Sequence, residues 1–198
     1  IKQNTLSSKI FFSGVGVHNG RAVKMSIEPA DVDTGIVFKR SDISKNNEIQ
    51  ATIDNVVNSS LCTKISNIKG VSVSTIEHLM AAFSALDLDN ILVKINAPEL
   101  PALDGSSNEY IKKILNAGIE TQNKTRKFIK IIKKVEVKSG SRFISIIPSN
   151  EFSINTSINY PETIIGYSEY FYKHSKENFI KNLSMARTYT LFEDIEKM

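Results

Sequence analysis

Cysteine is nearly absent from this 198-residue chain, and tryptophan is entirely absent. Cys62 is the one cysteine, so the chain forms no internal disulfide and contains no cysteine-rich zinc module. Any metal ion must therefore be bound by carboxylates and by the three histidines, His18, His78 and His174. Long apolar runs are missing too, since no segment approaches the roughly 20 apolar residues of a membrane helix. Residues 1–5 lack the pattern of a secretory signal, so we expect a cytoplasmic protein without membrane insertion.

The chain also lacks a strong excess of one charge. Its 25 Lys and Arg residues face 21 Asp and Glu residues, which leaves a net charge of +4. The basic residues are scattered along the chain, and this distribution disfavours nucleic acid as a partner. Hydrophobic residues make up 41% of the sequence, enough to bury a core in one large domain or two domains of roughly 100 residues.

The first third of the chain has the alternation of short antiparallel strands. Val23, Met25 and Ile27 alternate with polar or small residues, and a turn-like segment at 29–31 precedes a second short strand at 35–38. The period changes after Ser74, where apolar residues recur at helical spacing and predict a helix over residues 75–86. Ser74 and Glu77 match a capping box at the start of this helix.

A buried strand at 91–95 and a loop at 98–105 are predicted next. Ser106 and Glu109 form a second capping-box pattern in front of another helix, which Gly118 ends. Residues 122–126 are polar and indicate a linker. Strands at 128–138 and 142–147, strands at 152–159 and 168–172, and a helix at 176–183 follow it.

These elements predict an α+β fold of two similar two-layer α/β sandwich domains, because the turn and strand pattern near residue 20 is repeated near residue 140. We expect the first domain to span residues 1–122 and the second to begin at residue 123. Leu191, Ile195 and Met198 have helical spacing with no stop signal after them. The second domain is therefore expected to be truncated at residue 198.

Glu77 and His78 are the first candidates for chemistry. On a helical projection His78 lies opposite the apolar stripe, beside Ala81, Ala82 and Ala85, which allow another element or a ligand to approach the backbone. This position favours a metal ligand or catalytic group over a packed core histidine. Glu77 has two interpretations, a capping residue or a carboxylate placed beside a metal-bound water.

Two further segments are weaker candidates. His18 lies in a glycine turn, residues 14–20, that lacks the Lys and Ser/Thr of a phosphate loop, so His18 is either an exposed turn residue or a second active-site group. Thr188 precedes the predicted final helix and either caps it or helps its N–H groups to face an anion.

Six motifs occur in order along the chain, and together they resemble the UDP-3-O-acyl-N-acetylglucosamine deacetylase family: IKQNTL (1–6), GVGVHNG (14–20), LCT (61–63), STIEHLMAA (74–82), NAPE (96–99) with DGS (104–106), and ARTY (186–189). The resemblance spans residues 1–198. It implies a zinc-dependent hydrolase that removes acetate from the sugar nitrogen of UDP-3-O-acyl-N-acetylglucosamine in the lipid A pathway of Gram-negative bacteria. It also implies two α/β sandwiches with the site between them, and we expect a monomer.

The resemblance assigns roles to individual residues. It makes His78 a zinc ligand, Glu77 the general base toward the zinc-bound water, and Thr188 a donor to the tetrahedral oxyanion. Substrate-binding roles fall on His18, Leu61 and Cys62 in the cleft, Arg142 at the diphosphate, Tyr160 at the uracil, and Tyr189. The family's other two zinc ligands and the histidine that acts as its general acid are expected beyond residue 198. We therefore predict that residues 1–198 alone are inactive and bind zinc weakly or not at all.

Two alternatives stay open at this point. A non-catalytic RNA-binding α/β sandwich is favoured by the basic segment 128–138, but its lysines alternate poorly with aromatic residues that would stack on bases. In a purely structural module, Glu77 only caps the helix and His78 only packs.

Overall fold

The computed structural model describes residues 1–189 and has an α+β fold, as predicted. The chain divides into two compact units. Among the described residues, the first contains residues 1–126 together with residues 180–189, and the second contains residues 127–179. The helix predicted from Leu191 to Met198 lies outside the described residues. Within residues 1–189, no helix is both long enough and apolar enough to cross a membrane.

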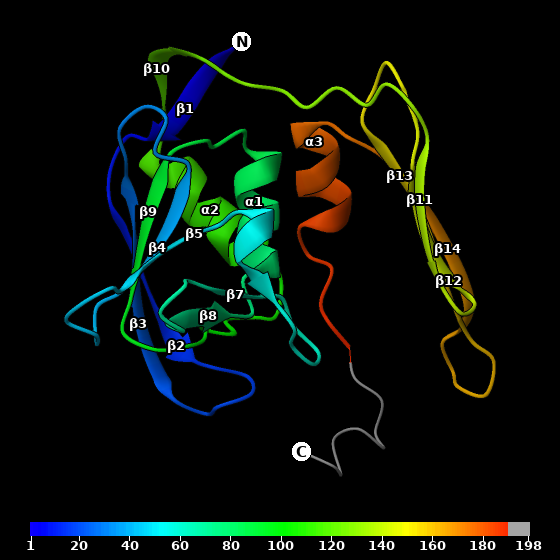
Figure 1. Ribbon diagram of the computed structural model, residues 1–198, viewed down its shortest axis with the longest axis horizontal. Coiled ribbons are helices and arrows are strands. Elements are labelled where there is room, and N and C mark those ends of the chain that lie inside the picture. Colours follow the sequence, from blue (N-terminus) through cyan, green and yellow to red (C-terminus); the bar gives the residue numbers. More distant parts are fainter. Residues whose placement is uncertain (190–198) are drawn as a thin grey trace. The chain divides into compact units, whose positions relative to one another are not determined.

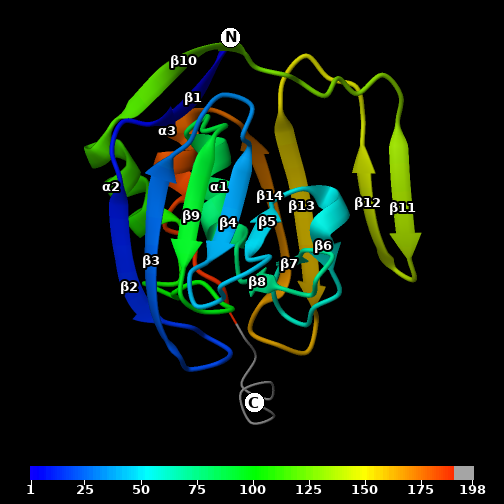
Figure 2. The same cartoon turned by 60° about the vertical axis from the view of Figure 1, so that its left-hand side comes forward.

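A five-stranded mixed sheet is the centre of the first unit (Figure 2). Its strands pair antiparallel except for β4 and β9, which run parallel from Ile36 opposite Ile91 to Arg40 opposite Ile95. The strand order is β2 (Ile10–Val15), β3 (Ala22–Pro29), β9 (Ile91–Ile95), β4 (Ile36–Arg40) and β5 (Glu48–Gln50). The strands predicted at 22–27, 35–38 and 91–95 are confirmed.

Helices α1 (Glu77–Ala85) and α2 (Asn108–Ala117) lie on one face of this sheet (Figures 1 and 2). The alternating apolar residues of the strands and the apolar stripes of the helices meet there and form the core. Its fully buried side chains include Ile27 and Ile95 from the sheet, Leu79 and Phe83 from α1, and Ile114 from α2. The periodicity of the sequence therefore identified the core-facing side of each element.

Two smaller sheets complete the first unit. One contains β6 (Val56–Val57), β7 (Lys64–Ser66) and β8 (Ser72–Ser74), and a short 3₁₀ turn at Ile53–Asn55 precedes it. The other pairs β1 (Lys2–Leu6) with β10 (Ile119–Thr125). The expected linker at 122–126 is thus wrong, because residues up to Thr125 belong to a strand. Hydrogen bonds explain why this polar segment forms a strand. The Gln122 side chain donates to Ala30 O at 2.8 Å and accepts from Asn90 Nδ2 at 2.7 Å.

The two predicted capping boxes are also wrong. Ser74 belongs to β8, where its N–H donates to Pro98 O at 2.9 Å and its hydroxyl donates to the same oxygen at 3.2 Å, and α1 begins at Glu77 after Ile76 without a side-chain cap. At α2 the Ser106 hydroxyl does accept from Asn108 N at 3.1 Å, but Glu109 pairs with Lys112 at 3.2 Å and does not bond back. The end of α2 at Gly118, with a φ of 84°, is confirmed.

The second unit contains two hairpins. β11 (Val135–Ser139) pairs with β12 (Arg142–Ile146), and β13 (Ser153–Tyr160) pairs with β14 (Gly166–Lys173). The predicted strand over 128–138 begins only at Val135, because its partner strand ends at Ile146. The predicted helix at 176–183 is present as α3 (Lys176–Asn178) followed by a π-helical turn, Phe179–Leu183.

The hairpins of the second unit have almost no core. Of the described residues 127–179, Tyr172 alone is buried, whereas Phe143 and Ile144 are each 68% exposed. An isolated two-stranded hairpin is marginally stable in water. Hydrogen bonding and strand register therefore define this unit more than buried apolar surface does.

A charged cluster ties β3 to its surroundings in the first unit. Glu28 accepts from Lys9 at 2.7 Å, from Lys94 on β9 at 2.8 Å and from the Ser26 hydroxyl at 2.9 Å. Burial alone would raise the pKa of Glu28, but the hydrogen bonds from these three residues outweigh it and lower the pKa from 4.5 to about 2.

Replacement of Glu28 by Gln should lower the stability of the first unit in a pH-dependent way. Because the folded-state pKa of Glu28 lies below its ordinary value, its contribution is complete above about pH 4.5 and is lost as the pH falls toward 2. We expect Glu28→Gln to reduce the free energy of unfolding by about 1 kcal/mol at pH 7, and the difference from wild type to shrink below pH 4.5. Urea denaturation followed by circular dichroism at pH 7, 4 and 3 measures this. Glu120→Gln, at an exposed position, is the control. If Glu28→Gln lowered the free energy of unfolding by the same amount at every pH, the assignment would be contradicted.

Candidate active site

Glu77 and His78 occupy the first turn of α1, and both are half-buried. The carbonyl oxygen of His78 accepts from the Ser107 hydroxyl at 3.0 Å, which attaches this turn to the start of α2. Ala82 and Ala85, four and seven residues after His78, are buried. The predicted small-residue face therefore does allow another element to approach α1 closely.

The Glu77 carboxylate is tied to a loop instead of to the helix start. Glu77 Oε2 accepts from the backbone N–H of Thr63 at 3.0 Å. Thr63 follows Leu61 and Cys62, so this bond places the predicted cleft residues beside Glu77. A carboxylate has about four lone-pair positions, and the Thr63 bond uses one of them. Glu77 thus keeps acceptor capacity for a proton.

Leu61 and Cys62 lie on the segment before β7. The Leu61 side chain is 71% exposed, and its backbone has a φ of 62°, an uncommon conformation for a bulky residue. Cys62 Sγ is 3.1 Å from Ser59 Oγ. An exposed leucine beside a half-buried Glu and His offers an apolar surface at the edge of a polar site.

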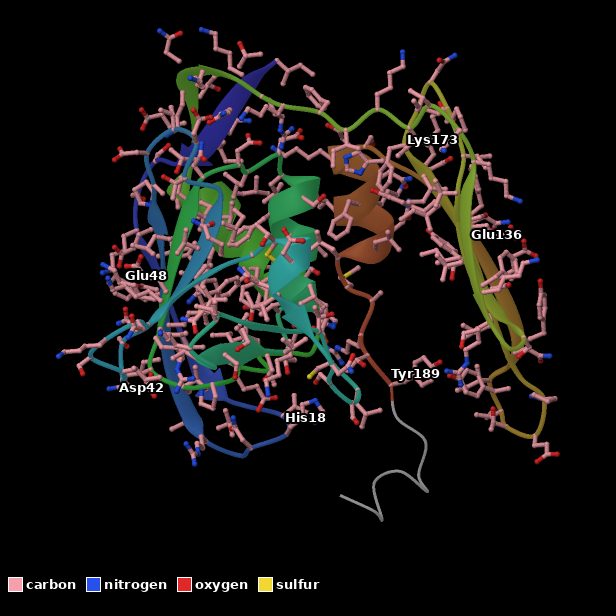
Figure 3. All side chains as sticks on the ribbon, viewed as in Figure 1. His18, Asp42, Glu48, Glu136, Lys173 and Tyr189 are labelled. Atoms are coloured by element: carbon pink, nitrogen blue, oxygen red, sulfur yellow. The ribbon has the colours of Figure 1, made fainter. Side chains whose placement is uncertain are left out.

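His18 lies at the turn between β2 and β3, and its side chain is exposed (Figure 3). The turn is attached to α1 through Glu99, whose carboxylate accepts from the backbone N–H groups of His18 and Asn19, each at 3.0 Å, and from the Thr75 hydroxyl at 3.1 Å. Thr75 comes two residues before Glu77. The structure therefore brings His18, Leu61, Cys62, Glu77 and His78 into one hydrogen-bonded region.

Glu99 is the residue that sequence reasoning missed. It was noted only as part of a motif, yet it is 1% exposed. The available signal was its context. Glu99 stands between Ala97-Pro98 and Leu100-Pro101, and a carboxylate in such apolar surroundings needs hydrogen-bond donors.

Residues 186–189 are attached to the same loop as Glu99. Arg187 Nη2 lies 3.9 Å from Asp104 Oδ2, and Asp104 also accepts from the N–H and hydroxyl of Ser106. Burial alone would raise the pKa of Asp104, but the bonds from Ser106 and the charge of Arg187 lower it. Thr188 follows Arg187 and is exposed, as is Tyr189, whose side chain is labelled in Figure 3. The helix that Thr188 was predicted to cap lies outside the described residues.

Arg142 and Tyr160 belong to the second unit, on different hairpins. Arg142 begins β12 opposite Ser139, and Tyr160 ends β13 opposite Gly166. Both side chains are exposed. Their predicted contacts with a diphosphate and a uracil stay predictions.

No group of three or more His, Cys, Asp and Glu residues within residues 1–189 is arranged to hold a metal ion. His174 has a packing role, because its Nδ1 lies 3.0 Å from the Tyr172 hydroxyl and its ring contacts those of Phe152 and Tyr172. A catalytic zinc takes about three protein ligands. His78 and Glu77 by themselves therefore do not complete a zinc site.

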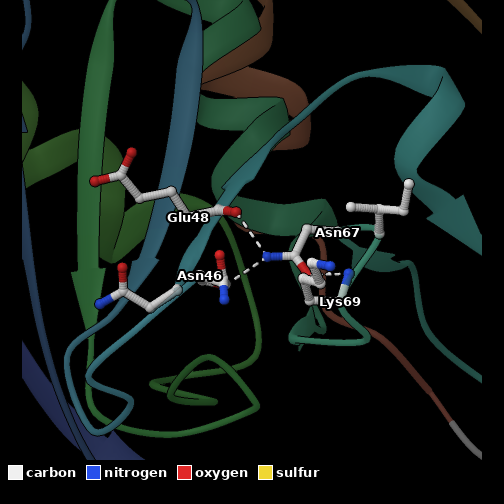
Figure 4. A pocket seen from close by; sticks show the side chains of 6 residues that line it. Asn46, Glu48, Asn67 and Lys69 are labelled. Atoms are coloured by element: carbon white, nitrogen blue, oxygen red, sulfur yellow. Dashed lines mark hydrogen bonds between the residues drawn. The ribbon is translucent and has the colours of Figure 1, made fainter.

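A surface hollow elsewhere on the first unit offers no competing site (Figure 4). Asn67 lines it, and its Nδ2 donates to Asn46 O at 2.7 Å and Glu48 O at 2.9 Å, while its Oδ1 accepts from Lys69 N at 3.0 Å. The polar groups of Asn67 are thus used to hold two loops together. None of the predicted site residues that the structure describes lines this hollow.

Comparison with known proteins shows the family of the chain. Residues 3–198 match the family model described as UDP-3-O-acyl N-acetylglycosamine deacetylase. Proteins named UDP-3-O-acyl-N-acetylglucosamine deacetylase from Actinobacillus succinogenes and Mannheimia succiniciproducens are 39% and 38% identical, over 99% of this chain and 65% of each relative. The relative of that name from Wigglesworthia glossinidia brevipalpis is 39% identical over 99% of this chain and 67% of its own length. The chain thus spans about 65% of the length of the curated relatives it matches. With a family match over nearly all its residues, the chain belongs to the UDP-3-O-acyl-N-acetylglucosamine deacetylase family.

Proposed function

We propose that the complete protein is a zinc-dependent hydrolase that removes the N-acetyl group from UDP-3-O-acyl-N-acetylglucosamine in lipid A biosynthesis. The observation that carries this proposal is the placement of Glu77 and His78 on the first turn of α1, with the Glu77 carboxylate bonded to Thr63 beside Leu61 and Cys62. The names of the relatives support the substrate and the reaction.

Amide hydrolysis needs a base for the attacking water and donors for the oxygen that becomes negative. Glu77 is half-buried and has acceptor capacity left after its bond to Thr63, which suits a general base. The hydroxyl of Thr188, next to the Arg187–Asp104 ion pair, is the proposed donor to the oxyanion.

His78 is proposed as one ligand of a zinc ion. The described residues do not supply the further ligands that a catalytic zinc requires, so the proposal places those ligands outside residues 1–189. His78 suits the role of ligand because its side chain is half-buried and its backbone is fixed by Ser107.

The remaining assignments concern substrate and architecture. We propose that His18, Leu61, Cys62 and Tyr189 line the cleft, that Arg142 contacts the diphosphate and that Tyr160 stacks on uracil. The complete protein is proposed to be a cytoplasmic monomer of two similar α/β sandwiches, the first over residues 1–122 and the second from residue 123. The sheet of the first unit with α1 and α2 on one face supports a two-layer sandwich.

The alternatives receive less support. An RNA-binding module would need the lysines of segment 128–138, but Lys134 and Lys138 both pair with Glu136, at 2.8 and 3.1 Å. In a purely structural module Glu77 would cap its helix, whereas its carboxylate bonds to Thr63.

Glu77→Gln in the full-length protein separates catalysis from structure. Gln keeps an oxygen that can accept from the Thr63 N–H, but it cannot take up a proton as a base. We expect turnover to fall by about 10²–10⁴-fold, with zinc content and hydrogen exchange at the Thr63 amide unchanged. Glu77→Ala should lose turnover and also speed exchange at Thr63. Glu109→Gln, at the start of α2, is the matched control and should leave turnover unchanged. Wild-type turnover in Glu77→Gln would refute the base role.

Residues 1–198 alone should not hydrolyse the substrate and should bind zinc weakly or not at all. The physical reason is that one histidine with a neighbouring carboxylate does not satisfy a tetrahedral zinc ion. Equilibrium dialysis followed by metal analysis should find far less than one zinc per chain, against about one for the full-length protein, and His78→Ala in the full-length protein should reduce that content. Full deacetylase activity from residues 1–198 would contradict the prediction.

A further inference from the structure

We propose that Glu99 is a positioning residue, which holds the His18 turn against the start of the helix that carries Glu77 and His78. This inference rests on the proposed function, because it assumes that the His18 turn forms part of the substrate cleft. Glu99 itself is 1% exposed and is too deeply buried to touch a substrate. It acts through the groups that it binds.

Both carboxylate oxygens of Glu99 are used as acceptors. Oε1 accepts from His18 N at 3.0 Å and from Thr75 Oγ1 at 3.1 Å, while Oε2 accepts from Asn19 N at 3.0 Å and from His18 N at 3.2 Å. Bonds from backbone N–H groups to a carboxylate are stronger than bonds between neutral groups. The turn is therefore attached by its backbone, which leaves the His18 side chain free to face outward.

The turn is shaped to fit this carboxylate. A Cβ atom at Gly16 would lie 2.5 Å from Glu99 Oε2 and 2.6 Å from Asn19 Oδ1, closer than any carbon approaches such atoms. Gly16 N–H donates to Arg21 O at 3.0 Å and Gly20 N–H donates to Gly16 O at 3.2 Å, which closes the turn over the carboxylate. A side chain at position 16 would thus displace the Glu99 carboxylate or the Asn19 side chain.

Thr75 is the second side of the attachment. It has a φ of 59°, which is rare for a β-branched residue and persists only where its surroundings enforce it. The backbone of Ser74 bonds to the residues on both sides of Glu99: its N–H donates to Pro98 O at 2.9 Å, and its carbonyl oxygen accepts from Leu100 N at 3.2 Å. The Thr75 hydroxyl donates to Glu99 itself. Thr75, two residues before α1, and the turn that carries His18 therefore both donate to the Glu99 carboxylate.

The test uses the full-length protein and the variants Glu99→Ala, Glu99→Gln, His18→Ala and the double variant of His18 and Glu99. We expect Glu99→Ala to raise KM for UDP-3-O-acyl-N-acetylglucosamine by about tenfold with a smaller change in kcat, and Glu99→Gln to recover part of the loss because it keeps one acceptor oxygen. In the His18→Ala background the replacement of Glu99 should have little further effect on KM, since the substrate contact of the His18 side chain, which Glu99 is proposed to position, is already lost. An additive effect in the double variant would overturn the proposal.

Hydrogen exchange provides a readout that does not depend on activity. Exchange at the His18 and Asn19 amides should become at least about tenfold faster in Glu99→Ala, because these N–H groups lose their acceptor. Gly16→Ala should have the same effect by displacing the carboxylate, and it carries the test if Glu99→Ala does not fold. Glu28→Gln is the matched control, since it removes the charge of a half-buried, ion-paired carboxylate from the same unit and should leave these two amides protected.

The outcomes separate the two proposals. Unchanged exchange at His18 and Asn19 in both Glu99→Ala and Gly16→Ala overturns the positioning role. If the wild-type protein does not hydrolyse the substrate, the proposed function fails, and faster exchange in the variants would still show that Glu99 holds the turn.

Discussion

The buried carboxylate of Glu99 is the interaction on which the candidate site depends. A buried carboxylate is costly unless donors surround it, and the donors here come from two separate parts of the chain, the His18 turn and Thr75. The hydrogen bonds to the Glu99 carboxylate therefore hold the His18 turn and Thr75 close to each other. Glu99 thereby links the turn after β2, which carries His18, to the segment that leads into α1.

The loop between β9 and α2 connects the sheet to the site. At its start Asn96 Oδ1 accepts from Lys24 N on β3 at 2.7 Å, which anchors it to the core strands. Glu99 holds the His18 turn, and Asp104 pairs with Arg187 beside Thr188. Each of the three residues was part of a recognisable motif, and each holds another segment in place. The motif thus serves to position neighbouring groups and has no evident chemistry of its own.

Local periodicity predicted the elements that build the core. The strands at 22–27 and 91–95 and the stripe of α1 were found because their apolar residues alternate or recur at helical spacing. The failures involve partners distant in sequence. Ser74 was expected to cap a helix, but its N–H and its hydroxyl both donate to Pro98 O in the β9–α2 loop, and the polar strand β10 pairs with β1. The role of Glu99 was missed for the same reason, since its partners lie at residues 18, 19 and 75.

The pairing of β1 with β10 also bears on how the chain folds as it is made. Residues 2–6 have no strand partner until residues 119–125 have been synthesised. At about 5–20 residues per second, roughly 6–25 seconds separate the two events, and the N-terminal strand spends that interval with an open edge. Arg126, which pairs with Asp87 and Asp89, emerges immediately after β10 and secures its end. Translation speed through the codons of residues 2–126 therefore sets how long the β1 segment is exposed to chaperones and to other nascent chains.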